Sequence, residues 1–160
     1  MLVVSPPVVG CPLLSGSRVG VVATAASIGL AAPASTDVLN QFSQPGGNVN
    51  CVMGTENGGQ YYAACQINKF SYQPPPRSGT RPGWGSLFWL DQGNPAYLKC
   101  DGGPLVYPTP PPLGWEQTQS LGPLNRQNSN ENPSLPPSTL CRDNSSSHYF
   151  RIYPDHYLLG

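Results

Sequence analysis

The chain has 160 residues with 8 basic and 8 acidic side chains, so its formal net charge is zero. This balance gives no electrostatic case for binding nucleic acid or an anionic membrane surface. Only 10% of the residues are charged, whereas 20 prolines and 18 glycines interrupt helices. Three tryptophans, eight tyrosines and four phenylalanines are enough to supply a packed core. We therefore expect a single turn-rich domain with little helix.

The first 34 residues have the pattern of a secretory signal or leader. Arg18 precedes an apolar run over residues 19–34, whose small residues at 32–34 predict cleavage before Ser35. The run has 16 residues, whereas a membrane-spanning helix needs about 20. We therefore expect no stable membrane span after processing.

The stretch before Arg18 leaves two alternatives open. Residues 1–17 are either an extended leader or lie upstream of the true start of the protein. Residues 8–11, Val-Val-Gly-Cys, loosely resemble the cleavage box of a lipoprotein, in which Cys11 would carry the lipid.

Residues 44–72 predict a β-hairpin. Apolar residues alternate with other residues at Val49, Cys51, Met53, Tyr61, Ala63, Cys65 and Ile67. A period of two is typical of strands, and Asn57-Gly58 between the runs is a turn signal because both residues tolerate positive φ. Cys51 and Cys65 then lie on facing strands. A bridge between them would stabilise the fold by about 3 kcal/mol in the chain-entropy model.

Further strands follow along the chain. Residues 84–90 predict an apolar strand, and residues 96–100 predict its returning partner after a turn over 91–94. Residues 122–138 are rich in proline, asparagine and serine without an apolar period, so we expect a mobile loop there. Residues 139–144 and 148–153 predict two more strands around a serine turn.

These elements predict an all-β fold over residues 35–160. We expect a compact antiparallel β sandwich or small barrel, stapled by disulfides, with about six to eight short strands.

Three tryptophans and one histidine are candidate binding residues. On a regular strand Trp84 and Trp89 point to opposite faces, so one joins the core while the other packs at the rim or stacks on a sugar. Trp115 is of a type that is more often found in cores than on ligand surfaces. Seven residues separate His148 from His156, which is not zinc spacing. We expect no metal site and no cofactor.

Removal of residues 1–34 leaves four cysteines, and an even number in an exported chain indicates disulfides. Four cysteines allow three connectivities. We expect Cys51–Cys65 together with Cys100–Cys141, of which the second would stabilise the fold by about 4 kcal/mol in the same model.

Several short motifs occur in a fixed order along the chain. They include Gly47-Asn48-Val49-x-Cys51, Ala64-Cys65-x-Ile67, Trp84-Gly85, Cys100-x-Gly102, Leu140-Cys141-x-Asp143 and Tyr157-x-Leu159-Gly160. From about Phe42 to its last residue, the chain resembles an uncharacterised family of small exported actinobacterial proteins, common in mycobacteria. The resemblance implies a signal peptide, an all-β disulfide-bonded domain and an extracytoplasmic location. It implies no known activity.

Members of that family tend to have six cysteines, and two of those are missing here, near Thr80 and Arg126. If the two missing cysteines were partners, Cys100 and Cys141 remain as a pair. The resemblance therefore supports the second expected disulfide.

Two functional hypotheses follow. The first is a secreted or cell-envelope binding module without enzymatic activity, whose extracellular or envelope ligand is unknown, because no catalytic constellation is present and binding residues often lie on loops of a rigid scaffold. The second is a small secreted hydrolase that uses His148 with a nearby acid or serine, although no G-x-S-x-G elbow is present. The hydrolase requires His148 to lie in a concave site within hydrogen-bond reach of a partner. We expect the binding module.

Overall fold

A computed structural model describes residues 39–56, 58–76, 83–100, 105, 110–130, 132 and 134–160. The predicted signal segment and Cys11 lie outside these residues. The described residues form strands and no helix, and none of them belongs to a helix long and apolar enough to cross a bilayer. The strands are β1 (Asn40–Ser43), β2 (Val49–Glu56), β3 (Gln60–Ile67), β4 (Leu87–Asp91), β5 (Tyr97–Leu98), β6 (Thr118–Leu121), β7 (Leu124–Ser129), β8 (Ser138–Asp143), β9 (Tyr149–Ile152) and β10 (Tyr157–Leu159).

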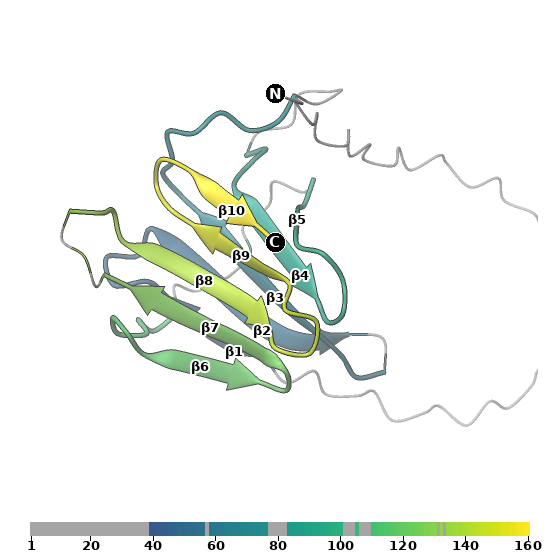
Figure 1. Cartoon of the computed structure of the whole chain (residues 1–160). Coiled ribbons are helices and arrows are strands. Elements are labelled where there is room, and N and C mark those ends of the chain that lie inside the picture. The colour runs from purple at the N-terminus through teal and green to yellow at the C-terminus, as the bar shows by residue number, and fades with distance from the viewer. Residues whose placement is uncertain are drawn as a thin grey trace, which may run out of the picture.

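The strands form two antiparallel sheets of five strands each, in the orders β1-β2-β3-β4-β5 and β10-β9-β8-β7-β6. Figure 1 shows the second sheet, in green and yellow, stacked on the first. The all-β prediction is therefore confirmed, and of its two forms the structure is a sandwich. The strands outnumber the six to eight expected, because short edge strands such as β1 contain too few residues to show a clear period.

The predicted β2–β3 hairpin is confirmed. Val49 pairs with Ile67, Cys51 with Cys65 and Met53 with Ala63. The ladder continues to Glu56 and Gln60, so the turn is shorter than the sequence suggests. Cys51 and Cys65 form the predicted disulfide, with their Cα atoms 4.1 Å apart.

The core lies between the two sheets. One face of each strand supplies it, because side chains alternate across a pleated strand. The first sheet and its loops contribute Phe42, Val49, Cys51, Met53, Ala63, Cys65, Ile67, Phe88, Leu90, Ala96 and Leu98. The second sheet contributes Leu124, Cys141, Phe150 and Ile152.

The predicted mobile loop over residues 122–138 is wrong for its first half. Residues 124–129 form β7, which lies inside the second sheet between β6 and β8. Burial alternates along β7, but its buried side chains are Leu124, Arg126 and Asn128. Two of these three are polar, so no apolar period marks the strand.

The side chain of Asn128 forms hydrogen bonds with the buried polar groups around it. Its side-chain oxygen accepts hydrogen bonds from Arg126 and, at 2.9 Å, from Thr139 Oγ1. Its amide nitrogen donates to the carbonyl of Leu113 at 2.7 Å. Burial of these groups is tolerated because hydrogen bonds replace part of their lost hydration.

Candidate functional site

The outer face of the second sheet carries the side chains that point away from the core. The strand register aligns them in two rows across the sheet. The first row contains Gln127, Leu140, Arg151 and Leu158. The second contains Asn125, Arg142 and Tyr149.

This face is hollowed by two adjoining depressions of about 210 and about 220 Å³. The first is lined by Leu140, Arg142, Tyr149, Arg151 and Leu158. The second is lined by Thr118, Asn125, Gln127, Leu140, Arg142 and Asn144. Because Leu140 and Arg142 belong to both, the depressions form one continuous surface, which we call the outer groove.

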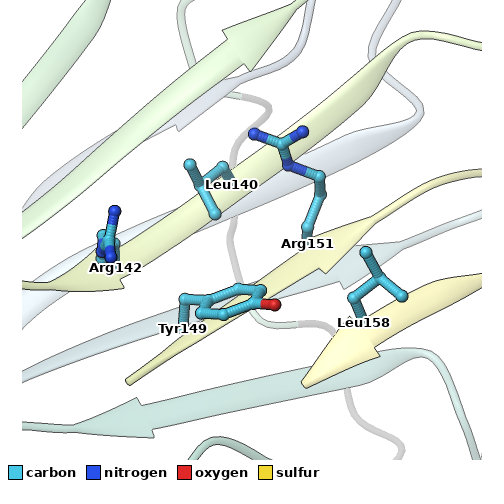
Figure 2. A pocket seen from close by; sticks show the side chains of 5 residues that line it. All are labelled: Leu140, Arg142, Tyr149, Arg151 and Leu158. Atoms are coloured by element: carbon cyan, nitrogen blue, oxygen red, sulfur yellow. The ribbon is translucent and has the colours of Figure 1, made fainter. Parts of the chain in front are cut away.

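Two guanidinium groups dominate the electrostatics of the outer groove. Among the described residues, the guanidinium group of Arg142 has no hydrogen-bond or ion-pair partner. The guanidinium group of Arg151 donates only a long hydrogen bond of 3.4 Å to the hydroxyl of Tyr153. Among the described residues, no acidic side chain lines either depression. Figure 2 shows both arginines on the same face of β8 and β9. An arginine fork matches the geometry of a carboxylate, so the pair is equipped to bind an anionic group.

Apolar groups flank the two arginines. Leu140 lies on β8 and Leu158 on β10, and Figure 2 shows the ring of Tyr149 on the strand between them. Leu158 is 46% exposed. Tyr149 exchanges two backbone hydrogen bonds with Gly160, and its ring lies so close to Gly160 that a Cβ there would collide with it. This close contact positions the ring, so the groove combines positive charge with a defined apolar wall.

The predicted binding residues Trp84 and Trp89 lie elsewhere. Trp84 precedes β4, packs against the edge of the core and donates through Nε1 to the carbonyl of Pro75 at 2.9 Å. Trp89 lies on the outer face of the first sheet, where its ring stacks on Tyr62 at 5.0 Å and Lys99 Nζ covers it at 3.4 Å. Only 7% of Trp89 is exposed, so little of the ring is open to a sugar.

Trp115 and His148 also lie outside the outer groove. Trp115 is half-buried before β6. His148 is half-buried in the β8–β9 turn, where its backbone amide is 3.4 Å from Ser146 Oγ, which accepts the hydrogen bond. Its ring makes no hydrogen bond to another described residue and lines neither depression. The geometry that the hydrolase hypothesis requires is therefore not formed by the described residues.

The predicted Cys100–Cys141 disulfide is wrong. Cys141 carries a free, buried thiol, whereas Cys100 is disulfide-bonded without it. The reason is the direction of β8, which points Cys141 into the core, where its Sγ lies 3.4 Å from Cys65 Sγ. Arg126 of β7 pairs directly with Cys141 in the sheet.

The sequence did not predict the outer groove. Tyr149 and Arg151 do alternate with Phe150 and Ile152, which indicates one polar and one apolar face of β9. Nothing in the sequence shows that Leu140 pairs with Arg151, or that β10 places Leu158 beside it. The site therefore depends on the order of the strands.

The outer groove places two arginines beside an apolar wall, and it is therefore the candidate binding site. Comparisons with models of known protein families, with curated protein sequences and with solved structures gave no match.

Proposed function

We propose that the protein is a secreted or cell-envelope binding module without enzymatic activity, and that its outer groove binds an acidic segment of a partner protein. The observation that carries this proposal is the pair Arg142 and Arg151, which line one depression that no acidic side chain of the described part of the chain lines. Hydrogen bonds from arginine to a carboxylate are charge-assisted and are roughly twice as strong as those between neutral groups.

The apolar wall decides between classes of acidic ligand. Leu140, Leu158 and the Tyr149 ring lie within the same depression as the arginines. An acidic peptide can place an aliphatic side chain on the leucines while its carboxylates reach the guanidinium groups. An acidic sugar has few apolar groups for the leucines, so the peptide is the better match.

Three observations support the location. The Cys51–Cys65 disulfide is typical of proteins that fold outside the reducing cytoplasm. The pattern over residues 1–34 is typical of an export signal. The resemblance to exported actinobacterial proteins points to the same compartment. Recovery of a chain starting at Ser35 from the culture medium of an expressing actinobacterium would support export, and a chain found only in the cytoplasm would contradict it.

The binding experiment uses a fluorescent peptide of alternating Glu and Leu, with a Gln-Leu peptide of equal length as the uncharged control. We expect the acidic peptide to bind and the Gln-Leu peptide to bind at least about tenfold more weakly, because each charge-assisted pair contributes about 1.5–3 kcal/mol. Fluorescence anisotropy at low and high salt measures both affinities, and salt should weaken the acidic peptide only.

The matched variants are Arg142→Gln and Arg151→Gln against Lys69→Gln. All three remove one positive charge, but Lys69 is exposed and lines neither depression. The proposal predicts a loss of about tenfold in affinity for each arginine variant and little change for Lys69→Gln. Equal losses in all three variants would show binding by net charge alone. Binding of polyglucuronate in preference to the peptide would replace the peptide by an acidic glycan.

A further inference from the structure

Three buried sulfur atoms meet in the core of the sandwich. Cys51 and Cys65 come from the first sheet, and Cys141 comes from β8 of the second. All three residues are 0% exposed, and their sulfur atoms all lie within 4.8 Å of one another. Cys141 Sγ is 3.4 Å from Cys65 Sγ, although these two residues are not bonded in this structure. Cys65 thus has two sulfur neighbours in reach, one within its own sheet and one across the core.

We propose that this three-cysteine centre exchanges its disulfide, with Cys65 alternating between Cys51 and Cys141. The thiolate of Cys141 attacks Cys65 Sγ, the Cys65–Cys141 bond forms and the Cys51–Cys65 bond breaks. Cys51 leaves as a thiolate and takes up the proton that Cys141 lost. No net electron is gained or lost, so the step requires neither an oxidant nor a reductant.

Arg126 supplies the charge that this step needs in a dry interior. It pairs with Cys141 in the sheet, and its side chain is fully buried. Its Nε and Nη1 atoms have no hydrogen-bond partner among the residues that the structure describes, although Nη2 donates to Asn128. A thiolate at Cys141 would offset this buried positive charge, which has no described carboxylate beside it.

The same surroundings make the exchange slow. Burial raises the pKa of the Cys141 thiol to about 12, and the positive charge of Arg126 counteracts that rise only in part. Since the thiolate is the attacking species, a small thiolate fraction limits the rate. We therefore expect the exchange to be slow, so that it becomes detectable only after prolonged incubation of the folded protein.

Exchange would change which parts of the fold are tied together. The observed disulfide joins residues 14 apart within one hairpin, whereas a Cys65–Cys141 bond joins residues 76 apart on opposite sheets. The longer loop restricts the unfolded chain more strongly in the chain-entropy model. Cys141 also lies between Leu140 and Arg142, so the new bond would anchor β8 directly beneath the outer groove.

Peptide mapping of the folded full-length chain tests the proposal. Samples are incubated for increasing times, quenched in acid, denatured and alkylated with N-ethylmaleimide, then digested with trypsin without reduction. No lysine or arginine lies within residues 19–68, so Cys51 and Cys65 share one peptide, whereas Cys141 lies on the peptide 127–142. A link between these two peptides reports the cross-sheet bond.

We expect the linked peptides to increase with time to at least about tenfold above the background of a Cys141→Ala variant, with alkylation appearing at Cys51. Suppose that, of Cys51, Cys65 and Cys141, only Cys141 is alkylated at every time point and the two peptides never become linked. Exchange then does not occur, and the proposal is overturned.

A Cys51→Ala variant provides a second, independent test. It leaves Cys65 and Cys141 as neighbouring thiols at 3.4 Å. Under oxidised glutathione, we expect this variant to form the Cys65–Cys141 link within one molecule. Both residues remaining alkylatable, or linked only between molecules, would overturn the proposal. If this variant does not fold, the time course of the natural chain still decides the question.

Discussion

Asp143 Oδ2 accepts a hydrogen bond from the backbone amide of Gly93 at 2.7 Å, and this bond joins the two sheets of the sandwich. Asp143 ends β8, while Gly93 lies in the turn between β4 and β5. The same carboxylate accepts hydrogen bonds from Ser145 and Ser146 in the following turn. Burial alone would raise the pKa of Asp143, but the bonds from Ser145, Gly93 and Ser146 lower it to about 2.

Replacing this carboxylate should therefore weaken the whole domain. We expect Asp143→Asn to lower the free energy of unfolding by about 2–3 kcal/mol, because an amide offers one acceptor oxygen where the carboxylate uses two. Urea denaturation followed by tryptophan fluorescence measures the change. Asp155→Asn is the control, since Asp155 is exposed and its pair with His156 lies on the surface. If Asp155→Asn lowered the free energy of unfolding by a similar amount, the hydrogen bonds of Asp143 would not explain the loss.

The same carboxylate predicts a loss of stability in acid. Its pKa is about 2 in the folded protein, and an unfolded aspartate has a pKa of about 4. A lowered folded pKa means that the contribution is complete above about pH 4 and is lost as the pH falls towards 2. We expect the difference in unfolding free energy between the natural chain and Asp143→Asn to shrink over this range. A constant difference from pH 6 to pH 2 would contradict the prediction.

Replacing Arg126 should raise the stability of the domain, whereas replacing Asp143 should lower it. Burial lowers the pKa of this side chain to about 10, and two of its nitrogens have no hydrogen-bond partner within the described part of the chain. Phe42 lies 4.5 Å from the guanidinium and offers only its ring face. Replacement by an apolar side chain of similar length removes a poorly compensated buried charge, so we expect Arg126→Met to raise the unfolding free energy by about 1–3 kcal/mol.

The exposed Arg142→Met change is the control for Arg126→Met, with an expected effect within about 0.5 kcal/mol. Thermal unfolding of the three proteins at one pH makes the comparison. A clear loss of stability in Arg126→Met would mean that the guanidinium contributes more through Asn128 and Phe42 than its burial costs.

A side chain at Gly122, in the turn between β6 and β7, should clash with a neighbouring ring and lower stability. Its φ is +56°, and a Cβ there would lie 2.6 Å from the Tyr61 ring. Gly58 has a φ of +84° with open space around it. Both glycine-to-alanine changes incur backbone strain, but only Gly122→Ala also displaces Tyr61. We therefore expect Gly122→Ala to cost about 1–3 kcal/mol more than Gly58→Ala. Equal losses of unfolding free energy would show that Tyr61 moves away freely.

The local hairpins could be predicted because their information is local. Alternation at Val49, Cys51 and Met53, a glycine-rich turn and a matching run to Ile67 specify both strands and their register. The paired cysteines then follow from the register alone. Asp91 and Gly93 likewise mark the turn between β4 and β5 in the sequence.

Strand β7 could not be predicted in this way, because its inward residues include a charged and an amide side chain. Arg126 donates a hydrogen bond to Asn128, which also accepts one from Thr139 of the neighbouring strand. A pattern of apolar residues cannot report partners that are brought together from another strand.

The all-β class, the first hairpin and its disulfide follow from local sequence, since neighbouring strands joined by short turns depend on side-chain alternation within a few residues. The approach of Cys141 to Cys65 across the core, the free thiol of Cys141 and the outer groove around Arg142 and Arg151 depend on the assembled fold. These features require two sheets to stack and five strands to take a particular order. That stacking and order come from burial of the shared core, which is summed over the whole chain and is not written in any one segment.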